Sequence, residues 1–116
     1  MKKQLIKNKK LSVVVKANAY GHGLVEIAQF CQRDEHVYSL SVNSLQEALL
    51  LRKDGITKPI LVLGLIDAPL EEAIVHDIRL PIYDLHQAYE ISRVAQLVGI
   101  SAKIHLKIDT GLSRLG

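Results

Sequence analysis

The chain has 116 residues, of which 48% are hydrophobic and 23% charged, so it carries enough apolar side chains for one domain with a buried core. This composition excludes an intrinsically disordered chain. The formal net charge of +3 depends on five lysines in the first ten residues, without which twelve acidic residues face ten basic ones. These lysines are Lys2, Lys3, Lys7, Lys9 and Lys10.

The basic tract at residues 2–10 has two interpretations. It is either an arm that binds nucleic acid or a solvated terminal segment. No aromatic residue alternates with the lysines to stack on bases, which favours the second interpretation. We therefore expect no nucleic-acid partner.

The cellular compartment is indicated by a single cysteine and by the lack of a long apolar run. Cys31 has no second cysteine to pair with, and it shares a helical pattern with Ala28, so we expect a small core residue in a reducing compartment. The basic start is not followed by the apolar stretch of a signal peptide. No run approaches the ~20 apolar residues of a membrane span. We expect a cytoplasmic protein with no membrane partner.

Short apolar runs alternate with amphipathic stretches along the chain. The runs predict buried strands at residues 11–15, 37–42, 60–63, 80–83 and 102–108. The amphipathic stretches predict helices at residues 24–31, 45–52, 70–75 and 88–98. Ser44 followed by Glu47 forms a capping box before the second helix, and Gly55 and Gly99 stand where helices should end.

The alternation of strands and helices predicts an α/β fold with a parallel sheet. Right-handed crossovers leave two layouts, an open doubly wound sheet or a barrel. A complete (β/α)8 barrel has eight strands and typically ~250 residues. In that layout, the five strands of this chain form a little over half of the barrel.

A lysine at the end of the first predicted strand is the first candidate functional residue. Lys16 precedes a short polar loop that ends in Tyr20-Gly21-His22-Gly23. In both layouts, functional side chains gather at the C-terminal ends of the strands. A strand-end lysine is most often a surface residue. Here the glycines let the backbone approach a ligand, and an amine held in a cavity can form a Schiff base.

The second candidate segment, residues 107–116, follows the fifth predicted strand. It contains Asp-Thr-Gly, a tripeptide found in aspartic proteases, but the alternation of strands and helices conflicts with the all-β fold of those enzymes. Strand alternation places His105, Lys107 and Asp109 on one face. That face is either exposed to solvent or, in a barrel, an unusually polar interior where a buried lysine needs a partner or a modification.

Two long motifs resemble those of the alanine racemases. Residues 14–23 are similar to the pyridoxal-phosphate attachment motif of that family, and residues 105–116 are similar to its second signature. Residues 44–48, 55–56 and 59–64 also resemble family sequence, in the expected order. The resemblance covers nearly the whole chain.

The resemblance implies a fold, an assembly and an activity. The family has an N-terminal α/β barrel of the (β/α)8 TIM type followed by a C-terminal β domain, and it works as a homodimer. Residues 1–116 would form the N-terminal part of that barrel, with about five parallel strands and without the β domain. The implied activity is an isomerase that converts L-alanine to D-alanine for cell-wall peptidoglycan with pyridoxal 5'-phosphate.

The same resemblance implies roles for four residues, and no metal site. Lys16 would hold the cofactor covalently and act as one of two acid–base groups at the substrate α-carbon. Tyr20 would bind the cofactor phosphate. Arg114 would lie near the phenolic oxygen of the cofactor and near the substrate carboxylate. Lys107 matches a position that is carbamylated in many members, which would turn a buried cation into a partner for Arg114.

The sequence also departs from the family pattern. Asn43 and Leu112 stand where alanine and methionine are common, and the tyrosine that supplies the second acid–base group has no counterpart. We therefore expect little or no racemase activity from these 116 residues alone. Three alternatives remain: a non-catalytic remnant that pairs with another chain through a sheet edge, a single-barrel cofactor-handling protein, and a racemase for another amino acid such as serine.

Overall fold

A computed structural model describes residues 9–66 and 68–116. These residues form five strands: β1 (Leu11–Val14), β2 (Val37–Val42), β3 (Ile60–Val62), β4 (Ile78–Ile82) and β5 (Ile104–Leu106). The helical elements are α1 (Lys16–Tyr20), α2 (Leu24–Arg33), α3 (Leu45–Lys53), α4 (Leu70–Val75) and α5 (Leu85–Val98).

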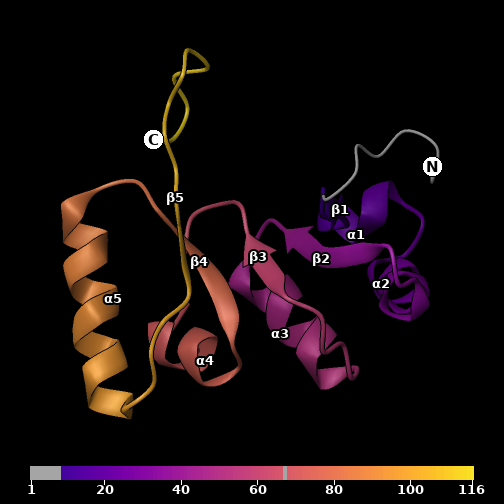
Figure 1. The fold of residues 1–116 in the computed structure, drawn as a ribbon, viewed down its shortest axis with the longest axis horizontal. Coiled ribbons are helices and arrows are strands. Elements are labelled where there is room, and N and C mark those ends of the chain that lie inside the picture. The colour runs from indigo at the N-terminus through magenta and orange to yellow at the C-terminus, as the bar shows by residue number, and fades with distance from the viewer. Residues whose placement is uncertain (1–8, 67) are drawn as a thin grey trace.

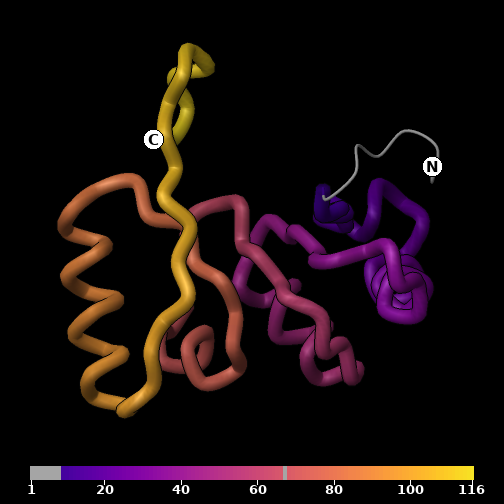
Figure 2. The backbone as a smooth tube through the Cα atoms, in the orientation of Figure 1, coloured from indigo at the N-terminus to yellow at the C-terminus, as the bar shows by residue number. Residues whose placement is uncertain are grey.

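The strands form one parallel sheet whose spatial order is the order of the chain, β1-β2-β3-β4-β5. Figures 1 and 2 show that helices α2 to α5 follow one another beside the sheet in the same order. A doubly wound sheet reverses its strand order, whereas a (β/α)8 barrel does not. The topology therefore decides between the two layouts and confirms the prediction of a partial barrel.

Aliphatic side chains fill the space between the sheet and the helices. Leu40, Ile60 and Leu80 from successive strands are completely buried, as are Leu45 and Leu51 of α3. Cys31 lies in the same cluster and is 4% exposed, which confirms its expected place in the core. The core is thus built from the residues that suit parallel strands covered by helices.

The opposite face of the sheet carries both polar and apolar side chains. Register places Val14 beside Ser41, Leu61 beside Arg79, and Pro81 beside His105, and paired residues of parallel strands point to the same side. On this face Ser12 Oγ lies 3.1 Å from Ser41 Oγ. All three residues of β5 are exposed, so His105 lies on this face in an exposed edge strand, which is the first of the two interpretations.

Helix ends occur where the sequence predicts them. Ser44 Oγ accepts a hydrogen bond from the backbone N–H of Glu47 at 3.2 Å, and the Glu47 carboxylate accepts one from the Ser44 N–H at 3.3 Å. Gly99 ends α5 in the left-handed conformation, with φ of 69°. The predicted capping box and helix stop are both confirmed.

Most predicted elements differ from the observed ones by one to three residues at an end, and three differences are of interest. β4 begins at Ile78 rather than at residue 80, because Arg79 interrupts the apolar run yet points to the polar face. β5 covers three residues rather than the predicted seven. Residues 16–20, expected as part of a loop, form the ordered element α1.

No helix in residues 9–66 and 68–116 is long and apolar enough to cross a membrane. The basic tract lies largely outside the described residues. Lys10, at its end, holds its amine 4.0 Å from the centre of the Tyr38 ring.

Candidate active site

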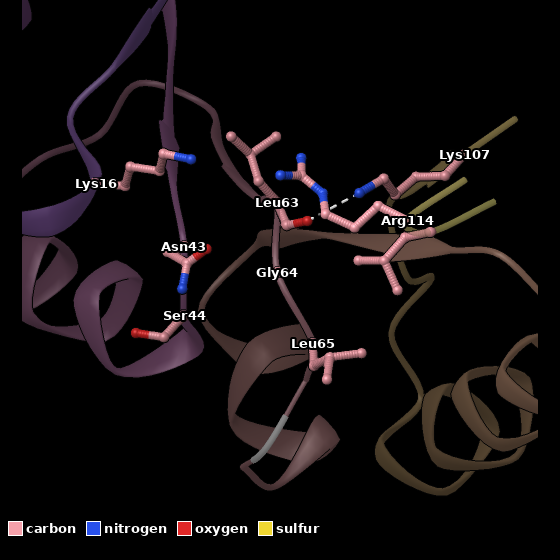
Figure 3. Close-up of a pocket in the computed structure, with 9 residues that line it drawn as sticks. Lys16, Asn43, Ser44, Leu63, Gly64, Leu65, Lys107 and Arg114 are labelled. Atoms are coloured by element: carbon pink, nitrogen blue, oxygen red, sulfur yellow. Dashed lines mark hydrogen bonds between the residues drawn. The ribbon is translucent and has the colours of Figure 1, made fainter. Parts of the chain in front are cut away.

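A cavity of about 520 Å³ lies where the C-terminal ends of β1, β2 and β3 meet the segment after β5. This size is within the range of ordinary small-molecule sites. Figure 3 shows Lys16 on one side of the cavity and Lys107 and Arg114 on the other. The lining residues are Lys16, Asn43, Ser44, Leu63, Gly64, Leu65, Lys107, Arg114 and Leu115.

Lys16 is presented by an unusual turn. It lies two residues after the end of β1 and is half-buried, and the next four residues, from Ala17 to Tyr20, have φ between 51° and 55°. This left-handed conformation costs about 1–2 kcal/mol for each residue that carries a Cβ. A run of four such residues persists only when the surrounding structure holds it.

Asn18 holds the turn from within. Its side-chain Oδ1 accepts a hydrogen bond from the Leu24 N–H at 2.9 Å, at the start of α2. Its backbone oxygen accepts two more, from Gly21 at 3.1 Å and Gly23 at 3.0 Å. The polar loop expected from the sequence is therefore a closed turn that ties the lysine to the following helix.

The backbone conformation of Gly23 favours glycine, and a side chain there would also displace the end of Glu26. The φ of Gly23 is 94°, and a Cβ at this position would lie 2.2 Å from Glu26 Oε2. The positive φ lets the chain pass from the lysine turn into a helix. α2 begins at the next residue.

Lys107 reaches the cavity from the other side. Its backbone N–H continues the β4–β5 ladder by donating to Ile82 O at 2.7 Å, and its Nζ donates to Leu63 O at 3.0 Å. Figure 3 shows the Arg114 guanidinium beside this amine, near Leu63. The two residues predicted from the second motif are therefore brought together with Lys16 at one cavity.

The charge of the cavity is positive. Lys16, Lys107 and Arg114 line it, and no Asp or Glu side chain does so among the described residues. An anionic ligand, or an anionic group formed on one of these amines, would neutralise this charge. A phosphate ester joined to a carbonyl group is one ligand class that matches such a set of donors.

Asp109 structures the segment between Lys107 and Arg114. Its Oδ1 accepts hydrogen bonds from the N–H groups of Gly111 at 2.8 Å and Ser113 at 2.9 Å. The bonds from Ser113 and then Gly111 lower the pKa of the carboxyl below its usual value. These bonds give Asp109 a structural role in this segment, and the all-parallel sheet contradicts an aspartic-protease fold.

His105 is the middle residue of β5, two positions before Lys107. Partial burial lowers the pKa of its imidazole, and the positive charge of Arg79 lowers it further. Arg79 also donates to Tyr38 Oη at 3.2 Å. These three residues form a polar layer on the inner face, separate from the residues that line the cavity.

The structure does not bring Tyr20 into the cavity lining. The tyrosine ends the left-handed turn and is 65% exposed. By contrast, Asn43, Ser44 and Gly64 line the cavity although the sequence did not single them out as site residues. Their positions in the sequence could have predicted this, because they come within two residues of the ends of β2 and β3, at the edge of the sheet where Lys16 follows β1.

Comparisons with known proteins identify the family of this chain. A sequence model described as the N-terminal domain of alanine racemase matches residues 1–116. The chain belongs to the alanine racemase family. It is 46% identical over 104 residues to an alanine racemase of Methanococcus maripaludis, covering 89% of this chain and 28% of that protein. It is 49% identical over 108 residues to one of Halalkalibacterium halodurans, covering 91% and 27%.

Solved structures of this family have the same fold. An alanine racemase of Clostridium difficile 630 superposes with a TM-score of 0.92 at 40% identity, covering 99% of this chain and 30% of that one. The same racemase in complex with cycloserine gives a TM-score of 0.93. The chain thus spans about 30% of the length of the relatives that it matches.

Proposed function

We propose that residues 1–116 are the N-terminal part of a pyridoxal-phosphate-dependent racemase that converts L-alanine to D-alanine, a precursor of peptidoglycan. The observation that carries this proposal is the meeting of Lys16, Lys107 and Arg114 at one cavity, from opposite ends of the chain. Membership of the alanine racemase family supports the choice of reaction. The β domain of that family is expected outside these residues.

The cavity fits the cofactor in charge and in chemistry. Its volume is about 520 Å³, and its lining supplies two amines and one guanidinium. Lys16 would hold the cofactor covalently through its amine, and the positive lining would receive an anionic ligand. When bound, pyridoxal phosphate supplies an electron sink that stabilises negative charge at the α-carbon of an amino acid.

The residues of this chain then have distinct tasks. Lys16 Nζ would take a proton from, or return it to, one face of the substrate α-carbon. Arg114 would orient the substrate carboxylate and the phenolic oxygen of the cofactor. Tyr20 would bind the cofactor phosphate by moving its exposed hydroxyl toward the cavity.

Lys107 would serve as the partner of Arg114. Carbon dioxide would add to its neutral amine, forming an N–C bond and releasing one proton, so that a carbamate anion replaces a cation. The absence of an Asp or Glu lining the cavity among the described residues supports this role, because Arg114 then lacks a carboxylate partner there. The carbamate would form a charge-assisted hydrogen bond with the guanidinium.

Racemisation needs a second acid–base group on the other face of the substrate. None of the tyrosines in the described residues lines the cavity. We infer that this group comes from a partner subunit in a homodimer, and that the 116 residues alone do not racemise alanine at a measurable rate. The unpaired, buried Cys31 supports a reducing, cytoplasmic setting for the assembly.

Serine is the alternative substrate that the sequence motifs leave open. Titration of the 116-residue chain with pyridoxal phosphate, followed by absorbance and fluorescence, tests the cofactor site. We expect saturable binding that Lys16→Met abolishes and that Lys53→Met, at the exposed end of α3, leaves unchanged. Equal binding by both variants would contradict the proposed site.

A further inference from the structure

Glu47 joins the lysine turn to a different part of the barrel. Its Oε1 accepts a hydrogen bond from the Ala17 N–H at 3.0 Å, directly after Lys16. Its Oε2 accepts from the N–H groups of Asn43 at 2.7 Å and Ser44 at 3.3 Å. One carboxylate therefore binds the end of β1 and the end of β2 together.

The hydrogen bond from Ala17 to Glu47 is made at the first residue of the strained turn. Ala17 is the first of the four left-handed residues, with φ of 53°. Alanine gains nothing from this conformation by itself, so the turn depends on the hydrogen bonds that hold it, one of them from the Ala19 N–H to Val15 O at 2.9 Å. Asn18 supplies those at the far end, through the Leu24 N–H. At the near end, the side-chain bond is the one from Glu47.

Glu47 is itself held firmly. It is the third residue of α3, and its N–H donates to Ser44 Oγ in the capping box. Asn43 and Ser44 also line the cavity, and the same carboxylate binds their backbone N–H groups. The carboxylate thus connects the Lys16 turn to a second wall of the cavity through a rigid helix end.

We propose that Glu47 is a positioning residue for Lys16, which fixes the left-handed turn so that the lysine amine extends into the cavity. This role is additional to capping α3. It rests on the proposed function only in taking Lys16 as the reactive amine, because the dependence of the turn on Glu47 can be measured without any cofactor.

The contacts require a carboxylate of this length. Three N–H groups donate to its two oxygens, so both oxygens must be acceptors. In Glu47→Gln one oxygen is replaced by an NH2 group, which cannot accept a hydrogen bond from a backbone N–H. Only the bonds to the remaining oxygen, either from Ala17 or from Asn43 and Ser44, are then kept. In Glu47→Ala all of these bonds are lost.

The first experiment uses the chain without cofactor. Hydrogen exchange of the Ala17 amide is followed by NMR in the wild type, Glu47→Gln and Glu47→Ala. We expect exchange at Ala17 to be about tenfold faster in Glu47→Ala, since a hydrogen bond to a charged group is lost. Glu47→Gln should lie between the wild type and Glu47→Ala.

Asp84→Ala is the matched control. Asp84 is the N-cap residue of α5, where its Oδ1 accepts from the Gln87 N–H at 2.8 Å, and it does not line the cavity. It should destabilise the fold about as much as loss of one cap does, without accelerating exchange at Ala17. Unfolding in urea, measured for every variant, separates a general loss of stability from a change in the turn.

The second experiment measures the reactivity of Lys16 in the same variants. The lysine amine condenses with the aldehyde of pyridoxal phosphate, forming a C=N bond and releasing water. Borohydride then adds hydride to the carbon, and water supplies a proton to the nitrogen. We expect labelling of Lys16 to be about tenfold slower in Glu47→Ala, and unchanged in Asp84→Ala.

The outcomes distinguish the two proposals. Wild-type exchange at Ala17 in both Glu47 variants would overturn the positioning role, as would a Glu47→Ala effect that Asp84→Ala reproduces at equal stability. Faster exchange at Ala17 together with an unlabelled wild type would support the role of Glu47 in the turn and overturn the cofactor site. Faster exchange with unchanged labelling would overturn the link between the turn and Lys16 reactivity.

Discussion

Gly64→Ala tests how closely the ends of β2 and β3 approach at the cavity. A Cβ on Gly64 would lie 2.4 Å from the backbone oxygen of Asn43 and 3.0 Å from its side-chain Oδ1. The first atom belongs to the backbone and cannot move aside alone. The strand ends must separate, which also breaks the hydrogen bond from Gly64 N–H to Asn43 O, now 3.1 Å long.

The expected cost follows from these two contacts. Overpacking in a close-packed region costs about 1–3 kcal/mol. A lost backbone hydrogen bond adds about 1 kcal/mol. We therefore expect Gly64→Ala to lower the free energy of unfolding by about 2–4 kcal/mol, measured by urea denaturation with far-ultraviolet circular dichroism.

Gly55→Ala is the matched control for this substitution. Gly55 has a positive φ of 86°, and a Cβ there would meet nothing within 4 Å. Its cost is conformational only, about 1 kcal/mol. A Gly64→Ala chain no less stable than Gly55→Ala would refute the close approach of the two strand ends.

Three further predictions concern stability and reactivity. Arg52 donates to the carbonyls of Ile56, Lys58, His76 and Asp77, so Arg52→Met should lower the urea midpoint substantially; an unchanged midpoint would show that water replaces these bonds. The pKa of His105 is lowered in the folded chain, so the unfolded chain binds more protons as pH falls. Stability should therefore decline below about pH 6.5, and less so in His105→Gln, as urea midpoints across pH can show. Burial raises the pKa of the Cys31 thiol, so iodoacetamide should alkylate it far more slowly in the folded chain than in urea, which mass spectrometry would detect.

The sequence predicted those parts of the fold that depend on local patterns. The period of the apolar residues located all five strands and four of the helical elements. Ser44 and Glu47 marked the start of α3 because a capping box uses residues three apart. Parallel strands end at one edge, so Lys16 and Lys107 could be expected to meet there even before the fold was known.

The sequence could not predict features that depend on long-range contacts. Nothing in Ala17 or Ala19 favours a left-handed turn, and the bonds at this turn include those of Asn18 and Glu47 and the one from the Ala19 N–H to Val15 O. The second role of Glu47 links residues thirty positions apart. The place of Tyr20 outside the cavity lining also follows from this turn, which ends at that residue.

The most direct test of the central claim is the site of covalent attachment. The 116-residue chain is mixed with pyridoxal phosphate, reduced with borohydride, digested and mapped by mass spectrometry. The cavity geometry predicts one cofactor per chain, attached to Lys16. No adduct at Lys16, or equal labelling of Lys16 and the exposed lysines such as Lys53, would contradict the assignment of this cavity as the cofactor site.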